Sequence, residues 1–147
     1  MPDEIRVLAV RQPWASLIVE GLKTIEIRSR PTNIRERVAI YASKKINELD
    51  CINSRGYVWN DKIHPDILKT GVILGTVDIY SSTTHPVISS AVFNINHKYH
   101  MAQDSYFTKE GVHFWYLKDP IKFSIPIPYK PPKGAVVWSK TVLPEGY

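Results

Sequence analysis

The stretch Gly21-Leu22-Lys23-Thr24-Ile25-Glu26-Ile27-Arg28 holds the most informative pattern in the chain. Polar and apolar side chains alternate from Lys23 to Arg30, as is typical of a strand with one buried face. The alternation places Ile25 and Ile27 on one face and four polar residues on the other: Thr24, Glu26, Arg28 and Arg30. Gly21 can adopt the left-handed conformation that ends a helix. The stretch therefore predicts a helix end followed by a half-buried strand with a polar face.

Two cations and a carboxylate fall within six residues of this stretch, namely Lys23, Arg28 and Glu26. Groups held so close together can neutralise one another in an ion-pair network. They can also face a ligand that supplies anionic or amide groups. The residues alone leave both interpretations open.

The residues before the stretch predict a short strand and a compact helix. Val7–Val10 is an apolar run typical of a strand. A helix is expected over residues 12–21, because Pro13 suits the first helical turn. Four large apolar side chains also recur there at helical spacing: Trp14, Leu17, Ile18 and Leu22.

The residues after the stretch predict further strands separated by loops and short helices. Arg37–Ser43 is expected to be a central strand, with Ser43 capping a helix from Lys44 to about Ile52. A loop is expected over 53–62 and a short helix over 65–69. Val72–Tyr80 is the clearest strand of the chain, and Gly75 within it indicates a bulge or a close backbone approach.

The C-terminal half has less regular patterning. Periodicity is lost from Ser81 to Glu110, where we expect at most a helix within 91–106. Three more short strands are expected, over 113–117, 121–127 and 135–138. Together these elements predict one α+β domain over residues 1–147, built on a small mixed β-barrel of about six strands with two or three flanking helices.

The positive charge of the chain is concentrated near its beginning. The 147 residues carry a net charge of +5, whereas Arg6–Lys45 alone holds nine cationic and three anionic side chains, a local balance of +6. Arginine suits the planar recognition of phosphates and carboxylates. This distribution makes an anionic partner plausible for the first third of the chain.

Composition argues against several protein classes. No apolar run reaches the roughly 18 to 20 residues that cross a bilayer, and the start of the chain lacks the pattern of a secretory signal, so we expect a cytoplasmic protein. The single cysteine, Cys51, argues against a disulfide framework and is expected to be a small buried hydrophobe. His97 and His100 have the spacing of two metal ligands but lack further donors, so no metal and no cofactor are expected.

The stretch 21–28 resembles the Gly-x-Lys-x-x-Glu-x-Arg signature of the ASCH (activating signal cointegrator homology) family. Its surroundings are also similar to that family, from 12–18 and 40–43 through 73–77 to the aromatic and proline-rich positions of 114–138. The resemblance implies a β-barrel related to the PUA fold, with the motif residues lining a cleft. It also implies an association with RNA or modified nucleosides, which fits the basic first third of the chain.

The leading hypothesis is an RNA- or nucleoside-binding module. Glu26 would accept a hydrogen bond from an exocyclic amine, while Lys23 and Arg28 would hold a carbonyl or a phosphate. The candidate ligand-binding residues are Gln12, Pro13, Trp14, Lys23, Glu26, Arg28, Arg30, Tyr41, Ser43 and Lys44.

Two other hypotheses stay open. Some members of the wider family remove the acyl group of N4-acetylcytidine with a lysine and a threonine, and Glu26 stands at the position of that threonine. A small amidohydrolase acting on an acylated nucleoside, or on RNA, would therefore use Lys23 and Glu26, with Glu26 activating water. The third hypothesis is a protein-interaction role in transcriptional or translational regulation. The sequence does not settle the oligomeric state.

Overall fold

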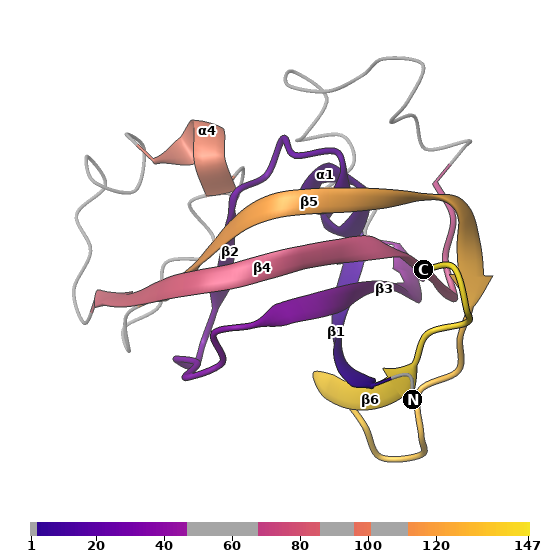
Figure 1. The fold of residues 1–147 in the computed structure, drawn as a ribbon. Helices are drawn as coiled ribbons and strands as arrows, with labels where there is room; N and C mark the ends of the chain where they lie inside the picture. The colour runs from indigo at the N-terminus through magenta and orange to yellow at the C-terminus, as the bar shows by residue number, and fades with distance from the viewer. Residues whose placement is uncertain (1–2, 47–67, 86–95, 101–111) are drawn as a thin grey trace.

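The structure is a computed structural model that describes residues 3–46, 68–85, 96–100 and 112–147 (Figure 1). Its strands and helices are, in chain order, β1 (Glu4–Gln12), α1 (Trp14–Val19), β2 (Ile25–Arg28), β3 (Arg37–Ile46), β4 (Val72–His85), α4 (His97–His100), β5 (Val112–Pro128) and β6 (Trp138–Val142). The six strands form one sheet in the order β2-β5-β4-β3-β1-β6. The sheet is mixed, because β1 and β3 run parallel while the other neighbours are antiparallel.

The sheet is strongly curled but open, so the expectation of a closed barrel is not confirmed. β2 and β6 are the two edges, and among the described residues no ladder joins them. The curl nevertheless brings distant strands together, as Figure 1 shows. Trp115 of β5 stacks on Trp138 of β6 with ring centroids 5.9 Å apart, and Arg28 of β2 donates a hydrogen bond to the carbonyl oxygen of Ala9 in β1.

Helix α1 supplies much of the interior. Five of its six residues are buried, and it contacts β1, β3, β4 and β5. Because so short a helix has little stability of its own in water, this burial is what holds it in place. We call the cluster it joins the main core, which consists of Leu8, Val10, Trp14, Ala15, Leu17, Ile18, Val19, Val38, Ile40, Ala42, Leu74, Val77, Ile79, Trp115 and Leu117.

Two smaller clusters pack elsewhere on the sheet. The second core consists of Val7, Ala39, Tyr41, Ile73 and Phe123. Strand β3 alternates between the cores, because Ile40 and Ala42 join the main core whereas Ala39 and Tyr41 join the second. A third cluster of Ile25, Val112 and Phe114 lies where β2 pairs with β5.

The junction between β1 and α1 differs from the sequence prediction. The strand continues through Gln12, and the helix begins only at Trp14, after a cis peptide bond between Gln12 and Pro13. The helix ends at Val19, two residues before its expected end, and Leu22 lies outside it and is exposed. Gly21 adopts the predicted left-handed conformation, with φ of 80°.

Strand β3 is longer than predicted. It runs through Lys44 and Lys45 to Ile46, so Ser43 lies inside a strand and does not cap a helix that begins at Lys44. Ladder pairing extends to this end, because Ile46 is opposite Gln12 of β1. The expectation of a helix was therefore wrong at its start, and its remainder, through about Ile52, lies outside the described residues.

Strands β4 and β5 form the longest ladder of the sheet. β4 extends to His85, beyond the predicted end at Tyr80, and the two strands predicted over 113–127 are one continuous strand. The strand passes the expected break at Lys118–Pro120 with Asp119 in the left-handed region, at φ of 51°. The bulges along this ladder are what allow the sheet to curl.

Gly75 confirms the predicted close backbone approach. The β4–β5 register shifts between Ile73 and Gly75. A side-chain Cβ added at Gly75 would lie 2.1 Å from the carbonyl oxygen of Ile121. Only glycine fits this crossing of two backbones.

Several predicted elements differ in position from the observed ones or lie outside the described residues. α4 lies within the expected 91–106 helix, and β6 begins at Trp138, where the last predicted strand was expected to end. Leu68 and Lys69 are not helical. The 53–62 loop, Cys51 and the start of the 65–69 helix lie outside the described residues. Neither described helix has the length and apolar character needed to cross a membrane.

Candidate ligand-binding site

At Glu26, the polar face of β2 is turned toward the interior of the protein. β2 pairs with β5 so that Glu26 is opposite Trp115, which belongs to the main core. Directly opposed residues of an antiparallel pair share a face, so Glu26 points toward the interior and is only 6% exposed. The short strand at the sheet edge thus carries a carboxylate into the protein.

Arginine and lysine neutralise this carboxylate from two sides. Arg28 donates to the Glu26 Oε2 atom from both Nε, at 3.1 Å, and Nη2, at 2.9 Å. Lys23 Nζ lies 3.6 Å from the other oxygen, Oε1, which is an ion pair but too long for a hydrogen bond. The ion-pair network that the residue spacing suggested is therefore present.

Lys23 is held between the two described helices. Its backbone N–H donates to the carbonyl oxygen of Leu17 at the end of α1. Its ammonium group donates to the carbonyl oxygen of His100 in α4 and lies 5.2 Å from the ring centroid of Trp14. Lys23 is buried, and these contacts fix its position relative to Glu26.

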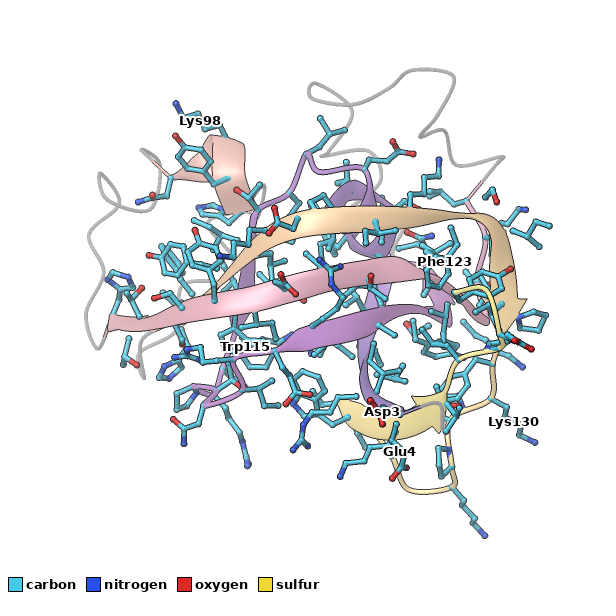
Figure 2. The ribbon with its side chains drawn as sticks, viewed as in Figure 1. Asp3, Glu4, Lys98, Trp115, Phe123 and Lys130 are labelled. Carbon is cyan, nitrogen blue, oxygen red and sulfur yellow. The ribbon has the colours of Figure 1, made fainter. Side chains whose placement is uncertain are left out.

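Arg28 is the most accessible member of the cluster. Its side chain is 23% exposed, whereas that of Glu26 is 8% exposed. Nη2 also donates to the Ala9 carbonyl oxygen at 2.8 Å, and the guanidinium carbon lies 5.6 Å from the Trp115 ring centroid. Figure 2 labels Trp115 on β5, well separated along this strand from Phe123 of the second core.

The observed contacts of Gln12, Pro13 and Trp14 are with other residues of the fold. Gln12 is fully buried. Its side-chain amide donates to Ser16 Oγ and to the Lys69 carbonyl oxygen and accepts from the Ser16 N–H, so it joins β1 to α1. Pro13 is buried beside it, and Trp14 belongs to the main core beneath Lys23.

No hydrogen bond or ion pair among the described residues joins the other sequence-predicted residues to the cluster. Arg30 is exposed just after β2, and its carbonyl oxygen accepts a hydrogen bond from the Trp115 indole. Tyr41 packs edge-on against Tyr129 in the second core, where burial, followed by the neighbouring Tyr129, raises the pKa of its hydroxyl. Ser43 is partly buried and Lys44 exposed at the far end of β3.

Sequence reasoning missed two polar residues on the face that carries Glu26 and Arg28. His113 of β5 is directly opposite Arg28, and Thr84 of β4 is directly opposite His113. The sequence alone assigns no role to His113 or Thr84. Only the strand register brings these residues together, and no spacing along the chain encodes it.

The remaining described histidines do not belong to a cluster of metal-binding side chains. His100 is buried, and its ring lies 5.8 Å from that of Phe114. Across the described ranges, no three His, Cys, Asp or Glu side chains lie close enough together to hold a metal ion.

Comparison with known proteins identifies the family. The sequence model of the ASCH domain matches residues 8–127, a range that runs from within β1 to within β5 and contains the whole Lys23–Glu26–Arg28 cluster. A human protein, activating signal cointegrator 1, is 38% identical over a 78-residue alignment that covers 49% of this chain. The match covers 13% of the length of that human protein.

Solved structures agree with this assignment at the level of the fold. The crystal structure of ASCH from Zymomonas mobilis has a TM-score of 0.59 and 17% sequence identity, and the match covers 95% of this chain and 87% of the other. A mutant form of that protein has the same TM-score at 16% identity, with 99% and 92% of the two chains covered. The curled six-stranded sheet thus resembles the fold of these ASCH structures, and the match to the family model shows that the chain belongs to the ASCH domain family.

Proposed function

We propose that this domain binds RNA or a nucleoside, and that Glu26 and Arg28 contact the edge of a base bearing an exocyclic amine. The observation that carries the proposal is that the two oxygens of the Glu26 carboxylate have different partners. Oε2 accepts two hydrogen bonds from Arg28. Oε1 accepts none from the described residues and has only the ion pair with Lys23 at 3.6 Å.

A carboxylate oxygen with unused lone pairs can accept an amine hydrogen from a ligand. Carboxylates accept from the exocyclic amine of cytosine in nucleic-acid recognition, and sequence-specific RNA recognition reads the edges of unstacked bases. Arg28 supplies the complementary donor, because its Nη1 group has no hydrogen-bond partner among the described residues. A base with an amine beside a ring acceptor, such as cytosine or adenine, matches this pair.

Lys23 and the charge of the surrounding chain support the same function. The ion pair between Lys23 Nζ and Glu26 Oε1, at 3.6 Å, offsets part of the cost of burying the carboxylate. The balance of +6 over Arg6–Lys45 favours association with a polyanion. Family membership is consistent with an RNA-related role, as the resemblance implied.

The experiment is fluorescence anisotropy of labelled single-stranded RNA across a salt series. We expect affinity to fall with rising salt, because binding releases counterions from the phosphates. We also expect a cytidine-rich strand to bind about tenfold more tightly than a uridine-rich strand, which lacks the amine. Arg28→Ala should remove both the affinity and the preference.

Arg6→Gln is the matched control, because Arg6 is an exposed cation paired with Glu36. Circular dichroism of each variant separates a loss of binding from a loss of fold. Equal affinity of the folded Arg28→Ala variant and the unmutated protein would contradict the proposal. Binding that ignores salt would instead favour the protein-interaction hypothesis.

A small amidohydrolase is the second candidate function. Lys23 Nζ and Glu26 Oε1 lie 3.6 Å apart, close enough for the lysine to polarise an acyl carbonyl while the carboxylate activates water. Incubation with N4-acetylcytidine tests this directly. Turnover that Glu26→Gln abolishes would support the hydrolase, and the absence of cytidine and acetate after prolonged incubation would count against it.

A further inference from the structure

The register of three strands places two rows of side chains on the face that carries the cluster. The first row consists of Glu26, Trp115 and Ser82, from β2, β5 and β4. The second row consists of Arg28, His113 and Thr84, from the same strands in the same order. The strand ends that bear these rows lie on the side of the molecule away from the chain termini (Figure 1).

The second row is polar and partly open to solvent. Arg28 and His113 are half-buried, and Thr84 is exposed. Thr84 Oγ1 and His113 Nδ1 are hydrogen-bonded at 2.9 Å, which fixes the imidazole ring. Within the described ranges, His113 Nε2 and Arg28 Nη1 have no hydrogen-bond partner.

We propose that His113, held by Thr84 and lying beside Arg28, forms a subsite for the phosphate group of a nucleotide whose base contacts Glu26 and Arg28. The inference rests on the proposed function, which it extends from a base to a nucleotide. With the Thr84 hydroxyl donating to His113 Nδ1, His113 Nε2 carries the hydrogen that a phosphate oxygen accepts, and the Arg28 guanidinium adds positive charge beside it. Opposed residues of a sheet have Cβ atoms roughly 5 Å apart, so one phosphate can contact neighbouring members of the row.

The spacing between the rows suits a single ligand. Residues two apart in a strand are separated by about 7 Å, so one nucleotide can reach both rows. The negative charge of Glu26 does not oppose a phosphate strongly, because Arg28 and Lys23 already neutralise it.

The opposite face of the same strands is a poorer anion site. Thr83 Oγ1 there is hydrogen-bonded to His85 Nε2 at 3.1 Å and to Tyr116 OH at 3.0 Å, so these groups satisfy one another. No arginine of the described residues joins them in the ladder. His85 therefore provides a matched control for His113, with the same chemistry on the same strands but the wrong face.

The test compares ligands that differ only in phosphate. Calorimetry gives the affinity of cytidine, cytidine monophosphate and the dinucleotide CpC for the unmutated protein, for His113→Gln and for His85→Gln. We expect the monophosphate to bind about tenfold more tightly than the nucleoside, as one charge-assisted hydrogen-bonded contact supplies. His113→Gln should remove that gain and leave cytidine affinity unchanged, whereas His85→Gln should preserve both.

A second readout does not depend on base recognition. Inorganic phosphate is titrated while the imidazole signals of His113 and His85 are followed by NMR. We expect saturable shifts at His113 and none at His85. The relative affinities of the monophosphate and the dinucleotide then distinguish a free nucleotide from an RNA phosphodiester as the natural source of the phosphate.

The outcomes separate this inference from the proposed function. If cytidine binds and phosphate adds no affinity, the phosphate subsite is overturned while base recognition stands. If phosphate shifts His113 but no nucleoside binds, the subsite stands and base recognition at Glu26 is overturned. If neither ligand binds nor shifts a signal, both are wrong.

Discussion

Glu26 is the residue on which the stability of the site depends most. A carboxylate that is 6% exposed is costly to bury, and its two cationic neighbours offset that cost. The buried cluster is thus stable as a whole but sensitive to the loss of one member. This part of the motif therefore stabilises the fold whether or not a ligand is bound.

We predict that Glu26→Gln lowers the free energy of unfolding by about 2–4 kcal/mol, because Lys23 and Arg28 then lose their shared counter-charge. Urea denaturation measures this loss. Glu36→Gln is the control, since Glu36 pairs with Arg6 at an exposed position and should cost less than about 1 kcal/mol. Equal losses in both variants would contradict the view that burial makes the Glu26 pairs important.

Tyr41 makes the free energy of unfolding of the domain depend on pH in the alkaline range. Burial and the neighbouring Tyr129 raise its pKa, so the unfolded chain releases this proton at a lower pH than the folded protein does. The stabilising contribution is complete below the unfolded value of about 10 and is lost as pH rises toward the folded value. We predict a fall in the free energy of unfolding above about pH 10 that Tyr41→Phe reduces.

Chemical denaturation between pH 7 and pH 11 tests this dependence. Tyr80→Phe is the control, because Tyr80 is exposed and should leave the alkaline fall as it is in the unmutated protein. An identical pH dependence in the Tyr41→Phe variant would show that Tyr41 does not contribute.

Among the elements, β4 depends on a single glycine. A Cβ at Gly75 would overlap the backbone of Ile121 in β5, and neither strand can move without disturbing a long ladder. We predict that Gly75→Ala destabilises the domain by about 3 kcal/mol or more. Thermal and urea unfolding measure the effect.

The variant Gly134→Ala distinguishes the energetic cost of steric crowding from that of a left-handed backbone conformation. Gly134 has φ of 89° but nothing within 4 Å of an added Cβ, so alanine there carries only the conformational cost, about 1–2 kcal/mol. A smaller loss for Gly75→Ala than for Gly134→Ala would contradict the steric account of the bulge.

The elements also show which local signals are reliable. Alternation correctly located β2, and Gly21 and Gly75 were correctly assigned left-handed and crowded positions. The helix expected after Ser43 was wrong at its start, because pairing of β3 with β1 overrides a weak capping signal. Gln12 was predicted to bind a ligand, yet its amide hydrogens and its carbonyl oxygen are engaged within the protein.

At the scale of the whole molecule, the sequence predicted that Lys23, Glu26 and Arg28 lie close together, but not which residues surround them. Lys23, Glu26 and Arg28 lie close together in one motif, so they were found from the chain alone. His113 and Thr84 come from distant strands, and only the β2–β5–β4 register brings them beside Arg28. For the same reason the barrel was expected and an open, curled sheet was found, because closure depends on long-range pairing.

The most direct test of the central claim is NMR observation of the Lys23–Glu26–Arg28 cluster during titration with a short cytidine-rich RNA. The reporters are the Arg28 Nε–H and the Trp115 indole N–H, which lie at Glu26 and at the Arg30 carbonyl oxygen respectively. We predict saturable shifts of both signals at the same RNA concentrations, while the exposed Arg6 Nε–H shifts little. Saturable RNA binding that leaves the Arg28 and Trp115 signals unmoved would contradict the account, because the ligand would then bind elsewhere on the domain.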